Sequence, residues 1–284
     1  MIDQVGELVQ YLAIIPERYW NDIDPKANRD ARFRKLDQEI ETIKYYAQGR
    51  VIAGHGIGLS LPSAVPLDEI LLEQVASFSA ELGLGWYSEH LSSFLLPDSH
   101  VPNAQAGMAL PVIYDEEMFE LVRNKLYKVQ DALKCQLLME NGRFFTTIPE
   151  MEMTEPEFFN RLYRELNCGM LLDLHNLHVT SMHGNVVPEK YLQEIDPDAV
   201  FEIHLAGGDE LAGFYIDSHS RFTPEEIWEW AFEYAPKFKN LKAIAFEFQE
   251  TYFEVLGVAG ITKELERMHD LAACCHKAPE AIYA

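Results

Sequence analysis

The chain has 284 residues, of which 48% are hydrophobic and 24% charged, and its formal net charge is −23. These proportions are typical of a soluble globular protein, and the length suits one (β/α)₈ barrel as well as two smaller domains. The negative charge argues against a nucleic-acid partner, because binding to phosphate backbones depends on Lys and Arg. It fits an enzyme that attracts cations, or simply a protein that its charge keeps in solution.

The chain contains four cysteines, Cys135, Cys168, Cys274 and Cys275, and no two of them are spaced as a CxxC pair. Adjacent cysteines make a poor disulfide, so we expect free thiols in a reducing compartment. The N-terminus, MIDQVGELVQYLAIIPERYW, has early acidic residues and no cationic region before an apolar core, which argues against a signal peptide. No apolar run approaches the ~20 residues that cross a bilayer. We therefore expect a cytoplasmic protein without a membrane partner.

Short apolar runs alternate along the chain with longer amphipathic segments. The runs are YLAIIP (11–16), RVIAGHG (50–56), GWYSEHL (85–91), CQLLMEN (135–141), GMLLDLHN (169–176), VFEIHLAG (200–207), FYIDSH (214–219) and AIAFEF (243–248). Most are too continuously apolar for one-sided antiparallel strands and predict a parallel sheet covered on both faces. FYIDSH is short enough to be a loop, in which case a strand would have to come from the segment before Tyr11.

The segments between these runs carry helix signals. The pattern of apolar and charged residues predicts helices over Asp68–Leu82, Asp115–Lys134 and Ile261–Cys275, the last followed by a tail to residue 284. Thr154–Glu157 reads as a capping box, in which the first and fourth residues bond to each other's backbone. Thr223–Glu226 repeats this pattern, with Pro224 at the first helical position, where proline is tolerated.

Strands that alternate with helices are typical of either an open doubly wound sheet or a closed (β/α)₈ barrel. About eight candidate strands favour the barrel, and the absence of a glycine-rich phosphate loop after the first strand weakens the Rossmann alternative. We find no linker or internal repeat, and therefore expect one barrel domain over residues 1–284. Residues 21–34 are charged and predict a mobile loop over the barrel mouth.

The apolar runs end on side chains that can bind metal or transfer protons. These residues are His55, His90, Glu140, Asp173, His204, Asp217, His219 and Glu247. The C-terminal ends of barrel strands meet at one mouth, where such folds carry their chemistry. One histidine at a strand end is more often a hydrogen-bonded core residue than a ligand. A whole series of ionisable strand ends is harder to explain structurally, because unpaired buried charge is costly, and it predicts a shared metal site.

The donor set of four histidines and four carboxylates suits iron, manganese or zinc better than calcium. Eight ligands exceed the need of one ion, so we expect two or three ions bridged by a carboxylate. Asn176 follows the Asp173 strand and could bind a metal or orient a ligand. His175 is a further candidate ligand, although we favour a supporting or packing role for it.

In combination, these segments resemble the family called domain of unknown function 692, the multinuclear non-heme iron-dependent oxidases. The matching segments are HGIGLSLP (55–62), YSEHLSS (87–93), LLMENGRFF (137–145), CGMLLDLHNLHV (168–179), EIHLAGG (202–208), IDSHS (216–220) and AFEF (245–248). The resemblance implies a xylose isomerase-like TIM barrel with two or three irons held by the eight strand-end residues. It also implies dioxygen-dependent modification of cysteine or other residues in ribosomally made peptides, often with a partner protein that presents the peptide leader.

The chain departs from the family pattern at several places. His175 stands where the family usually has the first Asn of D-V-N-N, and Gly208 stands where it usually has the last His of HLAGH. FEFQE replaces the usual E-R-D around Glu247, and the glycine-rich first strand is not evident before residue 11. These departures fit a divergent branch with a different substrate and an irregular first barrel strand.

The residues and the resemblance together predict an iron oxidase that modifies a cysteine-like residue of a peptide. A divalent-metal hydrolase or sugar isomerase, with zinc or manganese, is the alternative, since barrels of the xylose isomerase and endonuclease IV kind gather the same residue types. The negative charge disfavours a duplex-cutting nuclease. A third hypothesis is a barrel that binds metal or a peptide partner without catalysis.

Overall fold

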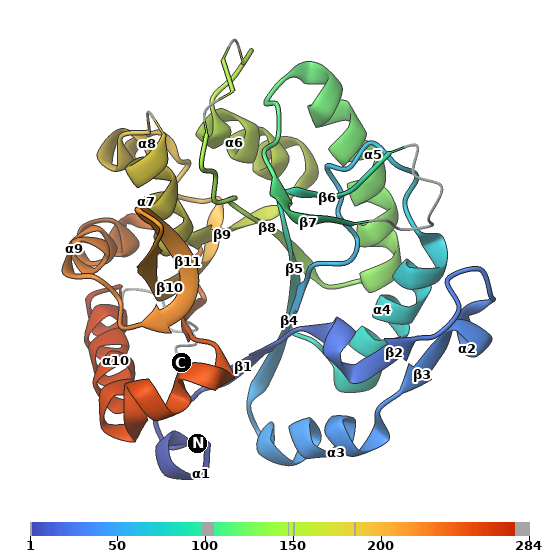
Figure 1. Cartoon of the computed structure of the whole chain (residues 1–284), viewed down its shortest axis with the longest axis horizontal. Coiled ribbons are helices and arrows are strands. Elements are labelled where there is room, and N and C mark those ends of the chain that lie inside the picture. The colour runs from blue at the N-terminus through green and yellow to red at the C-terminus, as the bar shows by residue number, and fades with distance from the viewer. Residues whose placement is uncertain (1, 98–104, 147, 150, 185, 276–284) are drawn as a thin grey trace.

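The computed structural model describes residues 2–97, 105–146, 148–149, 151–184 and 186–275, so the predicted tail after Cys275 lies outside the described residues. Its central sheet contains parallel strands that curve around a common centre, with helices outside them (Figure 1). In sheet order these strands are β1 (Tyr11–Ile14), β4 (Val51–Gly56), β5 (Trp86–His90), β8 (Gln136–Glu140), β9 (Gly169–Asp173), β10 (Val200–Leu211) and β12 (Ala243–Glu247). No hydrogen-bonded pairing joins β1 to β12 within the described residues, so the barrel is open at that seam.

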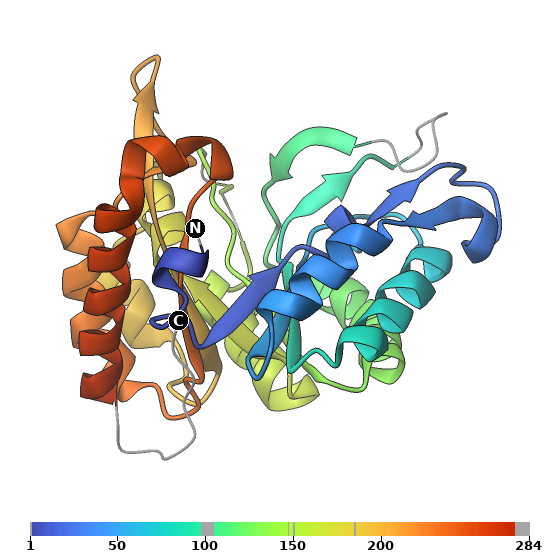
Figure 2. The same cartoon turned by 90° about the horizontal axis from the view of Figure 1, so that it is seen from below.

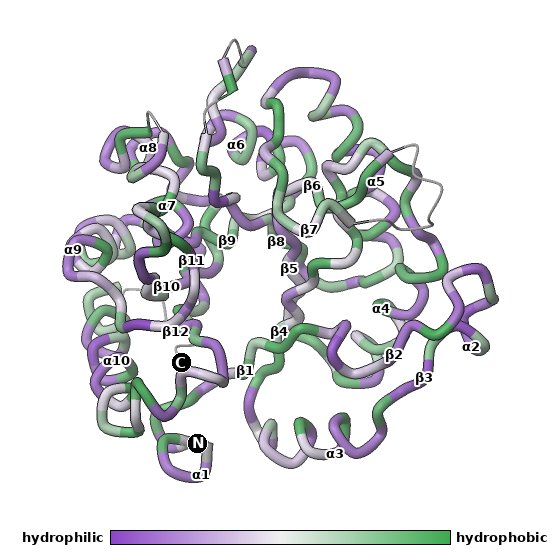
Figure 3. The backbone as a smooth tube through the Cα atoms, in the orientation of Figure 1, coloured by the Kyte–Doolittle hydropathy of each residue, from purple (hydrophilic) through white to green (hydrophobic). Residues whose placement is uncertain are grey.

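Helices surround the strands and alternate hydrophobic with hydrophilic residues along their length (Figure 3), as expected when one face packs on a sheet. The longer helices are α3 (Asp37–Tyr46), α4 (Glu69–Leu82), α5 (Glu116–Leu133), α6 (Glu155–Leu166), α7 (Leu174–His183), α8 (Pro188–Glu194), α9 (Glu225–Tyr234) and α10 (Phe253–Cys275). Short helical segments are α1 (Ile2–Val5), α2 (Arg29–Arg32), η1 (Pro16–Tyr19), η2 (Ala235–Lys237) and η3 (Glu250–Tyr252). Among the described residues, no helix is both long and apolar enough to cross a membrane.

Of the two predicted capping boxes, one forms and one does not. Thr154 and Glu157 make both reciprocal bonds at the start of α6. The second prediction was wrong: Pro224 is itself the residue before α9 and no side chain caps that helix. The Thr223 N–H instead donates to the Glu264 carboxylate at 3.4 Å, because α10 packs against this turn.

The FYIDSH segment is a strand, but not a parallel one. β11 (Phe214–Arg221) pairs antiparallel with β10 and forms the edge of the sheet. Only Ala212 and Gly213 connect the two strands, with φ of 53° and 83°, and so short a connection can only reverse the chain. The segment before β1 contains α1 instead of a strand. The predicted α/β barrel is thus confirmed, with seven parallel strands where we expected eight.

Residues 21–34, for which we expected a mobile loop over the barrel mouth, contain regular elements. They contain most of an antiparallel pair, β2 (Trp20–Asp22) and β3 (Phe33–Lys35), with α2 between its strands. The buried Arg32 guanidinium pairs with Asp22 and Asp68 at 2.8 and 2.7 Å, which ties the segment to the start of α4. The pair lies outside the ring of strands (Figure 1).

Two hairpins extend from the mouth of the barrel. The β10–β11 hairpin continues directly from the inner strand β10, and β6 (Ser93–Leu95) pairs with β7 (Gln105–Leu110) after β5 ends. Figure 2 shows these hairpins on opposite sides of the same end of the barrel. The described strands therefore present their C-terminal ends between two raised walls.

Candidate metal centre

The alternation of side chains along each strand explains how the site is built. Residues i and i+2 of a strand point to the same face, and the inward face first carries apolar residues and then ionisable ones. The apolar residues Ala53, Leu138, Leu171 and Ala245 belong to one buried cluster inside the barrel. Two positions later on the same strands come His55, Glu140, Asp173 and Glu247. The ionisable groups thus lie as one layer on an apolar floor.

The register of the sheet brings the remaining residues alongside these. His90 of β5 is opposite Glu140 of β8, and His204 of β10 is opposite Asp173 of β9. β11 carries Asp217 and His219, whose side chains also lie near the end of β12. The structure therefore brings all eight predicted strand-end residues to one end of the barrel, together with His175 and Asn176 from the first turn of α7.

The first group of donors surrounds Glu140, which is 1% exposed. Its Oε2 contacts His90 Nδ1 and lies 3.4 Å from His55 Nε2. His55 Nδ1 lies 2.8 Å from Ser88 Oγ, whose hydroxyl donates to the Gly54 carbonyl. Because that hydroxyl proton is already used, His55 must donate from Nδ1, which leaves the lone pair of Nε2 facing Glu140.

His204 connects this group to a second one. The donor atoms of His55, Glu140 and His204 lie within 4.8 Å of one another, and so do those of Asp173, His204 and Glu247. His204 Nε2 is 3.3 Å from Glu202 Oε1 and Nδ1 is 3.2 Å from Glu247 Oε1. Although burial opposes the shift, the carboxylates of Glu247 and Glu202 raise the pKa of His204. Its Nδ1 faces the centre and would become a ligand on losing its proton.

The third group contains His175, Asp217 and His219, whose donor atoms also lie within 4.8 Å of one another. Asp217 Oδ1 is 2.9 Å from His175 Nδ1 and 2.7 Å from His219 Nε2. On its far side, His175 Nε2 lies 3.1 Å from the Tyr215 hydroxyl. His219 has φ of 50°, a conformation uncommon for residues other than glycine. We favoured a supporting role for His175, and its place beside Asp217 and His219 fits either that role or a ligand position.

Burial sets the protonation of the histidines nearest Glu140. Burial lowers the pKa of His55 to about 4, although Glu140 opposes the shift. Burial also lowers the pKa of His90 to about 3, with the Arg143 charge adding to the effect. Both imidazoles are therefore neutral at neutral pH, the state in which imidazole binds metal.

The pKa values of two carboxyl groups of the centre, Asp173 and Glu247, shift in opposite directions. Burial, then the charges of Glu140 and Glu247, raises the pKa of Asp173 to about 8. For Glu247 burial also acts to raise the pKa, but the positive charge of the neighbouring His204 outweighs it and leaves the pKa well below its usual range. Repelling carboxylates crowd the site, and a bound cation would relieve that repulsion.

The residues present fit a metal centre by a second criterion, the presence of buried polar atoms without hydrogen-bond partners. Glu140 Oε2, Asn176 Oδ1 and His204 Nδ1 are such atoms. The Asn176 amide donates to Glu140 Oε1 and to the Asn141 carbonyl, each at 3.1 Å, so only its oxygen is left over. Buried polar atoms are rarely left unpaired, and all three of these are atoms that ligate metals.

Sequence reasoning missed the residues that hold the donors in place. Glu202 is buried in the barrel, where it accepts hydrogen bonds from Tyr11 at 2.8 Å and Trp86 at 2.7 Å. The Asn141 side chain donates to the Asp173 carbonyl and accepts from its N–H, at 2.9 and 2.8 Å. Glu202 could have been found, because it precedes His204 by two positions and must share its face. Asn141 has no comparable signal in the sequence.

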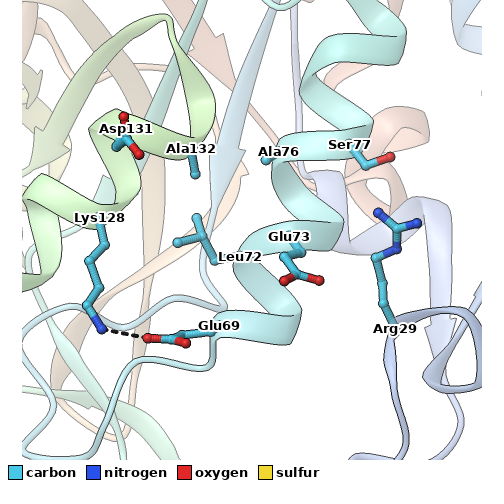
Figure 4. Close-up of a pocket in the computed structure, with 9 residues that line it drawn as sticks. All are labelled: Arg29, Glu69, Leu72, Glu73, Ala76, Ser77, Lys128, Asp131 and Ala132. Carbon is cyan, nitrogen blue, oxygen red and sulfur yellow. Dashed lines mark hydrogen bonds and ion pairs between the residues drawn. The ribbon is translucent and has the colours of Figure 1, made fainter.

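A groove of about 650 Å³ lies elsewhere, between α4 and α5 on the outside of the barrel. Leu72, Ala76 and Ala132 contribute to its lining, and the Lys128–Glu69 ion pair of 2.6 Å lies at its edge (Figure 4). None of the candidate ligands lines this groove, so we do not assign the chemistry to it.

Comparison of the sequence with known proteins identifies relatives over nearly the whole chain. The family described as RiPP precursor modification enzyme MbnB/TglH/ChrH matches residues 2–273. A UPF0276 protein of Neisseria meningitidis serogroup C is 33% identical over 180 residues, which cover 63% of this chain and 62% of that protein's length. The UPF0276 protein PM0211 of Pasteurella multocida is 28% identical over 291 residues, covering 94% of this chain and 88% of that protein.

Solved structures with the same fold include D-psicose 3-epimerase with D-tagatose from Clostridium cellulolyticum, with a TM-score of 0.57, 12% identity and coverage of 96% of this chain and 92% of that one. Endonuclease IV from Thermus thermophilus gives a TM-score of 0.53 at 15% identity, covering 98% and 93% of the two chains. The IOLI protein with a binding zinc atom gives 0.51 at 13% identity, covering 94% and 98%. At such identities the likeness shows the fold alone, a xylose isomerase-like TIM barrel.

The fold, the ring of donor groups and the span of the family match agree with the resemblance seen in the sequence. This chain belongs to the family of RiPP precursor modification enzymes MbnB/TglH/ChrH.

Proposed function

We propose that the chain is an oxidase with two or three irons that modifies a cysteine-like residue of a ribosomally made peptide. The observation that carries the proposal is the presence of three adjoining groups of candidate donor atoms at one end of the barrel, two of which overlap at His204. One isolated metal site needs three or four ligands, whereas this arrangement offers adjoining positions. The family membership supports a peptide substrate.

The three groups indicate which residues would hold the metals. Glu140 and the imidazoles of His55 and His90 form the first set, with the Asn176 oxygen beside them. The other two sets are Asp173, His204 and Glu247, and His175, Asp217 and His219. Imidazole with carboxylate ligands suits iron, which when bound would supply redox chemistry with dioxygen.

The chain's own contribution is to orient these donors and to exclude water. Ser88, Glu202 and Tyr215 each bond the outer nitrogen of one histidine and so direct the other nitrogen toward the centre. The apolar floor of the barrel keeps water from approaching from below. Substrate can therefore reach the metals only from the mouth, between the two hairpins.

The position of the two hairpins suggests how a peptide substrate would approach the centre. An extended peptide would enter the mouth between the β6–β7 and β10–β11 hairpins, and a partner protein would present its leader. The four cysteines are free thiols in the structure, which fits a cytoplasmic setting. We expect no nucleic-acid or membrane partner.

A divalent-metal hydrolase or sugar isomerase is the second candidate. Its support is the donor set itself, since histidine and carboxylate ligands serve zinc and manganese as well as iron. The identity of the metal separates the two candidates: iron whose spectrum changes with dioxygen favours the oxidase, and zinc or manganese without such a change favours the alternative.

The test is elemental analysis and optical spectroscopy of protein purified without oxygen. We expect two or three irons per chain, and loss of at least one in Glu140→Gln. Glu264→Gln is the matched control, because Glu264 is also a buried glutamate but lies on α10 away from the centre. Unchanged metal content in Glu140→Gln would remove this residue from the ligand set, and iron-free protein that binds only zinc would refute the oxidase.

A further inference from the structure

One cationic side chain, Arg143, reaches into the metal centre from the loop after β8. Its Nε lies 3.0 Å from Asp217 Oδ2. In the part of the chain that the structure describes, this is the only ion pair between a candidate ligand and a lysine or arginine, because the other pairs of these residues involve histidines. The charge of Arg143 also helps to lower the pKa of His90. The guanidinium therefore contacts one donor group and acts electrostatically on another.

The backbone around Arg143 is held on both sides. Thr180 of α7 donates from Oγ1 to the Gly142 carbonyl at 3.4 Å and accepts from the Phe144 N–H at 3.0 Å. Asn141, at the start of the loop, exchanges two hydrogen bonds with the backbone of Asp173. A cation on a loop fixed in this way is preorganised, so that binding a ligand costs little ordering.

Arg143 is also accessible, unlike the residue that it contacts. Its side chain is 32% exposed, whereas that of Asp217 is 4% exposed. A guanidinium has five N–H donors in a planar fork, and its shortest contact with Asp217 is made by Nε. Asp217 Oδ1 is occupied by the two histidines of its group. An arginine that only balanced the charge of Asp217 could be as buried as Asp217 itself. The exposure of Arg143 therefore indicates a further role for its guanidinium.

We infer that Arg143 binds a carboxylate of the substrate, next to the atom that is presented to the metals. Arginine pairs with carboxylates through two parallel hydrogen bonds, and Arg143 offers an accessible cation beside the buried donors of the centre. The inference rests on the proposed function, since it assumes that substrate approaches bound metal. It narrows the substrate to peptides in which the reacting residue lies beside an acidic side chain or the C-terminus.

The experiment uses two small thiols as probes of the full, metal-loaded chain without oxygen. Mercaptoacetate carries a thiol and a carboxylate, and 2-mercaptoethanol carries a thiol and a hydroxyl. Binding is followed by the optical change of the metal on thiolate coordination. We expect mercaptoacetate to bind about tenfold or more tightly than 2-mercaptoethanol, the effect of one charge-assisted contact. In Arg143→Gln this preference falls to within about twofold, and Arg143→Lys is intermediate.

Arg123→Gln is the matched control, because Arg123 has similar exposure, 34%, and one ion pair on α5. It should keep the wild-type preference. A preference that persists in Arg143→Gln would overturn the inference, since mercaptoacetate would then be chelating the metal unaided. Loss of metal from Arg143→Gln would also overturn it, by assigning the side chain to support of Asp217.

A separate result would locate the failure in the proposed function. If neither thiol changes the optical signal of the metal, the proposal that the substrate is a cysteine-like residue is wrong. The arginine site is then tested by comparing acetate with acetamide through the same optical signal. An effect of acetate that is stronger in the wild type than in Arg143→Gln would still support the arginine site. Equal effects in the two proteins would contradict it.

Discussion

The interior of the barrel has two layers drawn from the same four strands. The floor consists of Ala53, Leu138, Leu171 and Ala245, and the rim two residues later consists of His55, Glu140, Asp173 and Glu247. Both layers are almost completely removed from solvent, except at Glu247, which is 23% exposed. The floor satisfies its burial by packing, whereas the rim holds polar atoms such as Glu140 Oε2 that contact histidines but make no hydrogen bond. This difference supports the proposal that the rim binds a ligand while the floor provides stability.

The largest expected effect is at His204, which two donor groups share. His204→Ala should lose at least one metal per chain, because His204 lies where two donor groups overlap. Metal content by elemental analysis measures this. If the variant folds and keeps its full metal content, His204 is not a ligand, and the claim that the rim binds metal is contradicted at this residue.

A smaller loss is expected at the edge of the rim. His175→Asn removes one imidazole from the group with Asp217 and His219 and should cost about one metal per chain. His178→Asn, one turn further along α7, is the control, because His178 belongs to none of the three donor groups. Its ring packs against those of His175, Tyr215 and Trp230. Full retention of metal in His175→Asn would mean that His175 only orients Asp217.

A substitution in the floor should change the stability of the protein instead of its metal content. Leu171 is completely buried, and Leu171→Ala should lower the free energy of unfolding by about 2–5 kcal/mol through lost transfer energy and a cavity. Denaturant unfolding measures the loss, and elemental analysis should show unchanged metals. Loss of metals at unchanged stability would mean that the two layers do not have separate roles.

The carboxyl group of Glu155 also has a shifted pKa but is not a candidate metal ligand, so it can be compared with the carboxyl groups of the rim. Burial raises the pKa of Glu155, at the start of α6, to about 7, although the Tyr114 hydroxyl bonds to it and opposes the shift. The folded state then holds this proton more tightly than the unfolded chain, so stability falls as the pH rises from about 4.5 to about 7.

Glu155→Gln removes that titration. Its stability relative to the wild type should therefore increase by about 1–3 kcal/mol between pH 5 and pH 8, as measured by urea unfolding. Metal content should not change. A constant difference across this range would show that the Glu155 carboxyl is not perturbed in the folded protein.

Much of the site could be predicted because strand position determines where a side chain points. Parallel strands bring their C-terminal ends together, so His55, Glu140 and Glu247 could be placed in one mouth without knowledge of their contacts. The direction of β11 could not be predicted, because it depends on the positive φ of Ala212 and Gly213. Neither residue identifies a hairpin as clearly as an Asn-Gly pair would.

Supporting residues escaped prediction for a different reason. Asn141 and Tyr215 act through hydrogen bonds to residues 32 and 40 positions away in the sequence. No spacing rule links such partners. His175 was predicted mainly as a support. It lies in the first turn of α7, and only the arrangement of α7 beside β11 places it next to Asp217.

The most direct test of the account is anomalous X-ray diffraction from crystals of the chain loaded with iron under anaerobic conditions. The account predicts at least two iron peaks at the barrel mouth, one of them within bonding distance of His204 and the others among the neighbouring donor groups. A single peak, or iron bound away from Glu140, His204 and Asp217, would contradict a shared multinuclear centre.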